Sequence, residues 1–210
     1  WNDMRFWLDR GVDGFRIDVV DRMLKDPNLR DNPPNPHYVQ FRDNPVNAFE
    51  RVYSERYEGI HELIQEFQQV IKSYDGRVSI GEIQYYADPE SMVVYYGDYE
   101  SHELDLPFNF GLILQPWQAK SIREFVIAYD AAVPPYGWPN YVLGNHDQHR
   151  LATRVGSLDQ ARIAAMLLLT LRGTPFIYQG DELGMENVDI PPHLVQDPQG
   201  KNLPGYTRDV

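Results

Sequence analysis

The sequence predicts an α/β fold built on parallel β-strands. Five short apolar runs alternate with helix-sized segments, three of those segments have clear helical patterns, and each run precedes a segment long enough to cross back over a sheet. Hydrophobic residues make up 42% of the 210 residues, which is enough to bury a core. From these patterns alone, a (β/α)8 barrel and a doubly wound sheet both remain open.

The first predicted strand covers residues 11–20, a β-branched and aromatic run that contains two glycines. The first predicted helix covers residues 59–73, because its apolar residues fall on one helical face. The members of that face are Ile60, Leu63, Ile64, Phe67 and Ile71. A turn at Asp75-Gly76 leads into the second predicted strand, residues 77–83.

The second half of the chain continues this alternation. A weaker strand is predicted over residues 104–110, followed by a helix that opens at Ser121 and ends before Pro134. The Ser121 hydroxyl can cap the first turn of this helix while Glu124 reaches back, a pattern called a capping box. The remaining elements are a strand at residues 140–145, a helix from a second capping box at Ser157 to about Arg172, and a strand within residues 174–180.

Two long segments interrupt the alternation of strands and helices. Residues 26–58 contain five prolines and form a connection far longer than usual between a strand and a helix. Residues 187–210 are also rich in proline. Both segments follow strands, so in a barrel both would lie on the face where active sites are built.

Composition excludes several classes of function. The formal net charge of −12 disfavours nucleic acid and anionic membrane surfaces as partners, and the absence of cysteine removes thiolate catalysis and cysteine-bound metals. His61-Glu62 lacks the second histidine of a zinc-protease helix, and nucleotide-binding glycine motifs are absent from the sequence, so we expect no metal or cofactor. The longest apolar run, residues 164–169, is much shorter than a membrane span. Composition leaves the oligomeric state and the cellular compartment open.

Charged residues inside the first predicted strand mark a candidate site. Side chains alternate along a strand, so Arg16 and Asp18 lie on one face and the neighbouring apolar side chains on the other. A charged pair in a buried strand is costly unless the two groups are paired. The pair is therefore either a structural salt bridge or a carboxylate that its neighbour holds ionised for function.

Two further acids also follow strands. Glu82 comes directly after Gly81, a residue that indicates the close approach of a backbone or a ligand. Asp147 follows Asn145 and His146 at the end of the fourth predicted strand. Three carboxylates at strand ends would converge on one site in a barrel.

The segments GFRIDVV, GEI and NHD, in this order, resemble three conserved regions of the α-amylase family of glycoside hydrolases, in its α-glucosidase and oligo-1,6-glucosidase branch. The segments WPNYVLGNHDQHR, GTPFIYQGDELGM and IPPHLVQDPQGKN support the resemblance, which covers essentially the whole chain. Each short motif is weak by itself. Their order and spacing over five strands make the combination specific.

The resemblance implies a retaining α-glucosidase that hydrolyses terminal α-glucosidic bonds of short oligosaccharides through a covalent glucosyl-enzyme. In that reaction Asp18 would be the nucleophile and Glu82 the general acid and base. Asp147 would hydrogen-bond sugar hydroxyls, with Arg16 and His146 as further substrate-binding residues. An oligosaccharide is the expected partner, without a metal or cofactor.

The resemblance also implies that the strands are the fourth to the eighth of a TIM-type (β/α)8 barrel, so that residues 1–210 form one partial catalytic domain. The N-terminal strands, the small inserted domain and the C-terminal β domain of the family are absent from this sequence. The chain begins with Trp1, and we interpret it as a fragment. A barrel half with open strand edges is expected to be inactive when expressed alone.

Other members of the family suggest alternatives. A sucrose or maltose isomerase, or a transglucosidase, would use the same acids, whereas a noncatalytic barrel like that of an amino-acid transporter heavy chain would not need them. Val19 resembles the residue found in α-1,6-acting members. Four tyrosines could stack on the leaving-group sugar, although packing is the more common role of tyrosine: Tyr85, Tyr86, Tyr95 and Tyr96.

Overall fold

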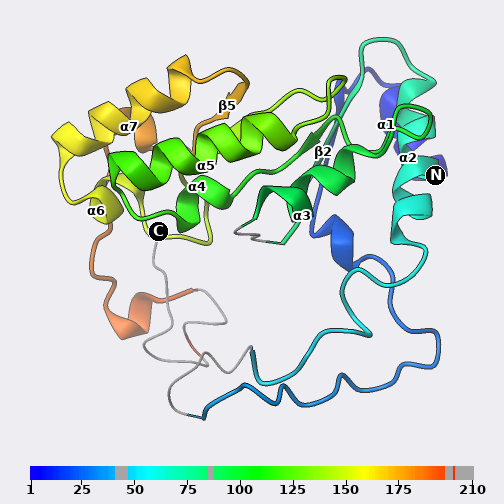
Figure 1. Cartoon of the computed structure of the whole chain (residues 1–210), viewed down its shortest axis with the longest axis horizontal. Helices are drawn as coiled ribbons and strands as arrows, with labels where there is room; N and C mark the ends of the chain where they lie inside the picture. The colour runs from blue at the N-terminus through cyan, green and yellow to red at the C-terminus, as the bar shows by residue number, and fades with distance from the viewer. Residues whose placement is uncertain (41–46, 85–87, 197–200, 202–210) are drawn as a thin grey trace. The chain divides into compact units, whose positions relative to one another are not determined.

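The structure, a computed structural model, describes residues 1–40, 47–84, 88–196 and 201 (Figure 1). The described residues form two compact units. The first contains Trp1–Gln84, Glu90–Phe108 and Pro134–Gly137, and the second consists mainly of Asn109–Val133 and the chain from Trp138 onward. Among the described residues, every helix is too short or too polar to cross a membrane.

The first unit is built on a parallel sheet of three strands, β1 (Gly14–Ile17), β2 (Val78–Gly81) and β3 (Leu106–Pro107). All three were predicted, with longer bounds. The strands are neighbours in the order of the sequence, β1-β2-β3. A barrel has this sequential order, whereas a doubly wound sheet reverses its order at the point where ligands bind.

Two glycines allow close packing within this sheet. A Cβ on Gly14, which has a φ of +154°, would lie 1.9 Å from the carbonyl oxygen of Val78 on the neighbouring strand. A Cβ on Gly81 would lie 2.3 Å from a methyl group of Leu104. The expectation that a backbone or a ligand approaches Gly81 is therefore wrong, because a packed side chain occupies that space.

Helices α1 (Asn2–Leu8) and α2 (Ile60–Lys72) contact each other, and α2 also packs against β2. The predicted apolar face of α2 is confirmed except for Leu63, which is only half-buried. The short elements of the region are η1 (Val20–Arg22), α3 (Pro89–Val93) and η3 (Val94–Tyr96). None of these three was predicted, because segments this short lack a helical period.

The second unit contains a parallel pair of strands, β4 (Asn140–Val142) and β5 (Thr174–Phe176), both predicted with longer bounds. Its helical elements are α4 (Gly111–Leu114), α5 (Ala119–Ala132), α6 (Leu151–Val155), α7 (Leu158–Thr170), η4 (Asp181–Leu183) and η5 (Pro192–Leu194). α5 and α7 lie side by side (Figure 1). The core includes the fully buried Tyr129 of α5, whose ring meets that of Tyr141 edge-on at 5.6 Å.

The two capping predictions have different outcomes. Ser157 caps α7 as predicted, because its hydroxyl accepts a hydrogen bond from the backbone N–H of Gln160. The capping box at Ser121 is wrong: α5 begins two residues earlier, at Ala119, with Gln118 as its N-cap. Ser121 therefore lies inside the helix, and the N–H of the next residue, Ile122, already donates to the carbonyl of Gln118 at 3.0 Å.

The long connection after β1 forms no α-helix within its described residues, as predicted from its prolines. An isolated antiparallel bridge joins Pro34 to Phe49, so the two arms of the connection run beside each other. At its beginning, the buried carboxylate of Asp26 accepts hydrogen bonds from the backbone N–H and the guanidinium of Arg30, and from the hydroxyl of Tyr57 near its end. Asp26 thus joins both ends of the connection.

We expect Asp26→Asn to destabilise this connection in a pH-dependent way. Hydrogen bonds from the Arg30 side chain hold the pKa of Asp26 well below its ordinary value of 3.8. The stabilisation is therefore present above pH 3.8 and is lost as the pH falls through the lower pKa of the folded state. The melting temperature of Asp26→Asn should fall clearly below that of the wild type at pH 7, and the gap should narrow at acid pH. Asp31→Asn, an exposed site in the same connection, is the control.

Candidate active site

The register between β1 and β2 brings two predicted acids together. Ile17, the last residue of β1, lies opposite Gly81, the last residue of β2. Asp18 and Glu82 are the next residues along their strands. Because parallel strands end at the same edge of a sheet, the two carboxylates meet there although 63 residues separate them in the sequence.

Arg16 connects the two carboxylates. One guanidinium nitrogen of Arg16 donates a hydrogen bond to Asp18 Oδ1, and the other lies 2.5 Å from Glu82 Oε2. The ion pair of Arg16 with Asp18 expected from the sequence is thus present, and Arg16 also pairs with Glu82. A guanidinium is planar and offers two donors side by side, so Arg16 sets the spacing of the two carboxylates.

Main-chain hydrogen bonds hold the position of Glu82. Its N–H donates to the carbonyl of Ile17 at 2.8 Å, and its own carbonyl accepts from Val20 at 2.7 Å. Between these partners lies Val19, which adopts a left-handed conformation with φ +34° and ψ +56°. A β-branched residue rarely adopts this conformation, and such strain is concentrated at functional sites. The conformation directs the Val19 N–H toward Glu82 Oε2, at 3.4 Å.

The two carboxylates differ in their environment. The side chain of Glu82 is 9% exposed, whereas that of Asp18 is 74% exposed. Burial, reinforced by hydrogen bonding with Asp18, raises the pKa of Glu82 above its usual range, although the positive charge of Arg16 opposes this shift. The arrangement offers an exposed carboxylate that can contact a ligand beside a buried carboxyl group that retains its proton to higher pH. Two neighbouring acids that differ in this way can act as a general acid and a nucleophile in one reaction.

Two cavities of the first unit open beside these strand ends, and the long connection forms most of their walls. One, of about 740 Å³, is lined by Val19 and by residues from both arms of the connection, among them Asn32 and Phe49. The other, of about 750 Å³, includes Gln84. Phe49, whose side chain is 55% exposed, lines both cavities together with polar side chains. Each cavity is large enough for a sugar unit.

The predicted residues His146 and Asp147 lie in the second unit, after β4. His146 Nε2 is 3.5 Å from Asp147 Oδ1, and the Asp147 N–H donates to the side chain of Asn145. Arg150 connects this turn to later parts of the chain, because its N–H donates to the side chain of Asn187 and its guanidinium to the carbonyl of Gln179.

Arg150 and Asp21 are buried charged residues near the predicted acids that sequence reasoning missed. Arg150 follows Asp147 by three residues, and Asp21 follows Asp18 by three residues. This closeness in sequence to a predicted acid was the signal by which both residues could have been found. A charged residue in a sequence is normally read as exposed, and its burial becomes evident only in the packed structure.

The tyrosines proposed for sugar stacking fall into two groups. Tyr95 and Tyr96 are 1% and 2% exposed, so a role in direct stacking on a sugar is wrong for them and packing is their role. Tyr85 and Tyr86 lie outside the described residues. His61, which the sequence excluded from a zinc-protease helix, is half-exposed and hydrogen-bonds the buried Glu103 at 2.8 Å.

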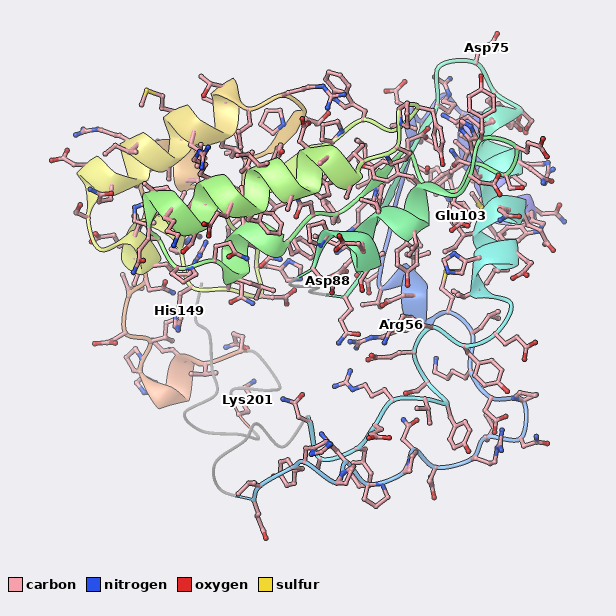
Figure 2. All side chains as sticks on the ribbon, in the orientation of Figure 1. Arg56, Asp75, Asp88, Glu103, His149 and Lys201 are labelled. Carbon is pink, nitrogen blue, oxygen red and sulfur yellow. The ribbon has the colours of Figure 1, made fainter. Side chains whose placement is uncertain are left out.

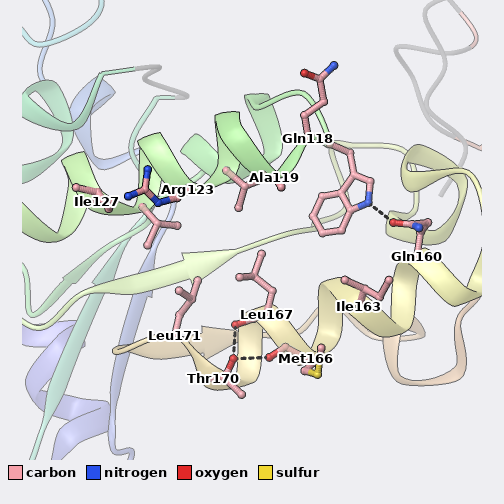
Figure 3. Close-up of a pocket in the computed structure, with 13 residues that line it drawn as sticks. Gln118, Ala119, Arg123, Ile127, Gln160, Ile163, Met166, Leu167, Thr170 and Leu171 are labelled. Atoms are coloured by element: carbon pink, nitrogen blue, oxygen red, sulfur yellow. Dashed lines mark hydrogen bonds between the residues drawn. The ribbon is translucent and has the colours of Figure 1, made fainter.

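A hydrophobic cavity of about 670 Å³ lies between α5 and α7 (Figure 3). Trp117 donates to Gln160 at one end, and the remaining walls are aliphatic apart from Gln118, Arg123 and Thr170. The lining contains no carboxylate and no histidine. The cavity therefore lacks the groups that acid–base or nucleophilic chemistry requires.

Comparison with known proteins identifies the family. The sequence profile described as alpha amylase, catalytic domain, matches residues 1–204. The chain is 34% identical over 197 residues to the amino acid transporter heavy chain SLC3A1 of Homo sapiens, covering 88% of this chain and 28% of that protein. It is 31% identical over 205 residues to the oligo-1,6-glucosidase of Parageobacillus thermoglucosidasius, covering 90% of this chain and 35% of that enzyme.

Among solved structures, the alpha-glucosyl transfer enzyme XgtA superposes with a TM-score of 0.85 at 32% identity, covering 99% of this chain and 40% of that chain. The chain thus spans about a third of the length of the two curated relatives described above. The chain is thus similar in sequence to a glucosidase and to a transporter heavy chain, and similar in structure to a glucosyl transfer enzyme.

Proposed function

Because this chain belongs to the α-amylase catalytic domain family, we propose that it carries the nucleophile and the acid of a retaining α-glucosidase acting on short oligosaccharides. The observation that carries this proposal is the contact of Arg16 with both Asp18 and Glu82 at adjacent strand ends. A merely structural salt bridge would need only one of these carboxylates. The two carboxylates and their different burial match what a double displacement requires.

In the first step, Asp18 attacks the anomeric carbon of the terminal glucose while Glu82 donates its proton to the glycosidic oxygen. The bond from the anomeric carbon to that oxygen breaks, the remaining sugar leaves, and a glucosyl ester on Asp18 forms. In the second step, Glu82 removes a proton from water, which attacks the same carbon and releases Asp18. The raised pKa of Glu82 favours the protonated form that the first step needs, and the positive charge of Arg16 lies beside Asp18.

The cavity beside Val19 is the proposed position of the leaving-group sugar. It opens next to the nucleophile and contains the exposed ring of Phe49, an apolar surface of the kind that carries one face of a sugar. We propose that Asp147 and His146 bind hydroxyl groups of the terminal glucose, by analogy with the family. Neither a metal nor a cofactor takes part in the proposed reaction.

The described strands belong to a partial (β/α)8 fold. We propose that β1 to β5 are the fourth to the eighth strands of the barrel and that residues 1–210 form one partial catalytic domain. Supporting this assignment, β1 to β3 are parallel neighbours in sequence order, and β4 pairs with β5 in parallel. Closure of the barrel would need the preceding strands, so we propose that residues 1–210 alone are inactive.

The experiment that tests the function uses the complete protein that contains this chain, with maltose, isomaltose and nitrophenyl α-glucoside as substrates. We expect hydrolysis, with α-glucose as the first product seen by proton NMR. Release of β-glucose would overturn the retaining mechanism, and absence of hydrolysis on all three substrates would overturn the glucosidase proposal. The ratio of isomaltose to maltose cleavage reports the linkage preference that Val19 suggests.

A transfer reaction is the second candidate, and the structural similarity to XgtA favours it. In that case the glucosyl group on Asp18 passes to a sugar hydroxyl instead of water. Incubation with sucrose and maltose would then give isomeric or longer sugars rather than free glucose. A transporter heavy-chain role, favoured by the 34% identity to SLC3A1, predicts no turnover of any of these sugars.

A further inference from the structure

A buried acid that the proposed reaction does not use, Asp21, lies beside the candidate site. It is 0% exposed and belongs to η1, the short helix that follows Asp18. Its carboxylate oxygen Oδ2 accepts a hydrogen bond from the backbone N–H of Gln84 at 3.2 Å. Asp21 thus connects the turn that carries the nucleophile to the segment that carries the acid.

Asp21 also contacts the end of the long connection. Its carbonyl accepts a hydrogen bond of 2.7 Å from the backbone N–H of Arg56, which Figure 2 shows beside η1. Three segments distant in sequence therefore meet at one buried residue. They are the turn after β1, the chain after β2 and the end of the long connection, where Arg56 lines the cavity that includes Gln84.

Other buried acids of this unit pair with side chains, Asp26 with Arg30 and Glu55 with Arg22. The Asp21 carboxylate accepts a hydrogen bond from a backbone N–H, that of Gln84, two residues beyond Glu82. A carboxylate used in this way sets the position of a backbone segment.

We propose that Asp21 is a positioning residue for Glu82: it holds the backbone of residues 82–84 against the strained turn at Val19, so that the Glu82 carboxyl stays beside Asp18. Main-chain bonds already fix residue 82 itself, through Ile17 and Val20. The side chain of Asp21 extends this connection to residue 84. Without it, the segment after β2 moves away from η1, and Glu82 gains access to water.

This inference rests on the proposed glucosidase function, and its test uses Asp21→Ala and Asp21→Asn in the complete protein that contains this chain. Asparagine keeps an oxygen that accepts the Gln84 N–H, whereas alanine does not. We expect Asp21→Ala to lower kcat about 10- to 100-fold with little change in KM, as small displacements of catalytic groups do. Asp21→Asn should restore most of that loss.

The pH profile separates positioning from simple destabilisation. Among the residues that the structure describes, Arg16 and Asp18 are the charged groups that act on Glu82, and both remain in these variants. Greater exposure of Glu82 in Asp21→Ala should therefore move the alkaline limb of kcat/KM to lower pH, because burial is the main cause of its raised pKa. The Gln84 amide should also exchange with deuterium faster in Asp21→Ala than in Asp21→Asn.

Asp105→Ala is the matched control. Asp105 Oδ2 also accepts a hydrogen bond from a backbone N–H, that of Ser79, which lies in β2 three residues before Glu82. It should lower the melting temperature and leave the pH profile unchanged. If Asp21→Ala behaves like this control, the proposal is overturned. If Asp21→Ala does not fold, Gln84→Pro, which removes the donor N–H, is compared with Gln84→Ala, which keeps it. Equal pH profiles of kcat/KM in these two variants would overturn the proposal. If the wild type has no glucosidase activity, the proposed function is refuted, and the proposal for Asp21 is then tested by amide exchange alone. Equal deuterium exchange of the Gln84 amide in the wild type and in Asp21→Ala would show that the Asp21 carboxylate does not hold residue 84.

Discussion

Asp18→Asn should abolish hydrolysis almost completely. The amide of asparagine is a poor nucleophile, so the glucosyl ester does not form and the reaction loses its covalent intermediate. We expect kcat on nitrophenyl α-glucoside to fall about a thousandfold or more, which corresponds to a barrier higher by about 4 kcal/mol. Because asparagine has nearly the size of aspartate and Asp18 is largely exposed, the melting temperature should change little.

Asp13→Asn is the matched control for this variant. Asp13 is also an exposed aspartate next to β1 and also contacts an arginine, Arg77, at 3.2 Å, but it lies at the opposite end of the strand. Its activity should equal that of the wild type. Turnover by Asp18→Asn within tenfold of the wild type would show that Asp18 is not the nucleophile.

Glu82→Gln should have an effect that depends on the leaving group. Glutamine cannot donate the proton that a departing sugar needs, so we expect cleavage of maltose or isomaltose to fall about a thousandfold or more. A dinitrophenyl leaving group needs no such proton, and the first step should remain fast with that substrate. The second step lacks its base and becomes slow. The variant should therefore release one equivalent of dinitrophenol rapidly and accumulate a glucosyl ester.

Mass spectrometry of the digested protein checks this result, because the added hexose should be found on the peptide that contains Asp18. The control is Glu103→Gln, a buried glutamate of the same unit that hydrogen-bonds His61, shown by its label in Figure 2. That variant should keep the wild-type dependence on the leaving group. An equal loss on all substrates in Glu82→Gln, or a hexose on another residue, would contradict the assigned roles.

Local patterns predicted most of the elements. The five strands and α2 follow from apolar runs and helical periodicity, which depend on residues a few positions apart. The Ser157 cap was correct, whereas the Ser121 cap was wrong because α5 begins at Ala119 without a side-chain cap, so the capping pattern alone does not locate the start of the helix. The helices α3, α4 and α6 escaped prediction because four or five residues show too little periodicity.

The candidate site was predicted in its residue types and only partly in its environment. Asp18, Glu82 and Arg16 were identified from their places at strand ends and from the family resemblance. The burial of Tyr95 and of Asp21 was not predictable, since burial depends on segments far away in the sequence. Gly81 shows the same difficulty: the sequence indicated a close neighbour, and the structure identified it as Leu104.

The sequence by itself determined the order of strands and helices and the acid at the end of each of two neighbouring strands, because periodicity and strand boundaries are local properties of the chain. Only the tertiary structure decided that Arg16 contacts both acids, that Glu82 is buried while Asp18 is exposed, and that Asp21 reaches Gln84. The physical reason is the register of β1 and β2. The hydrogen bonds between the two strands, and no property of either strand alone, set Ile17 opposite Gly81 and so place the acids side by side.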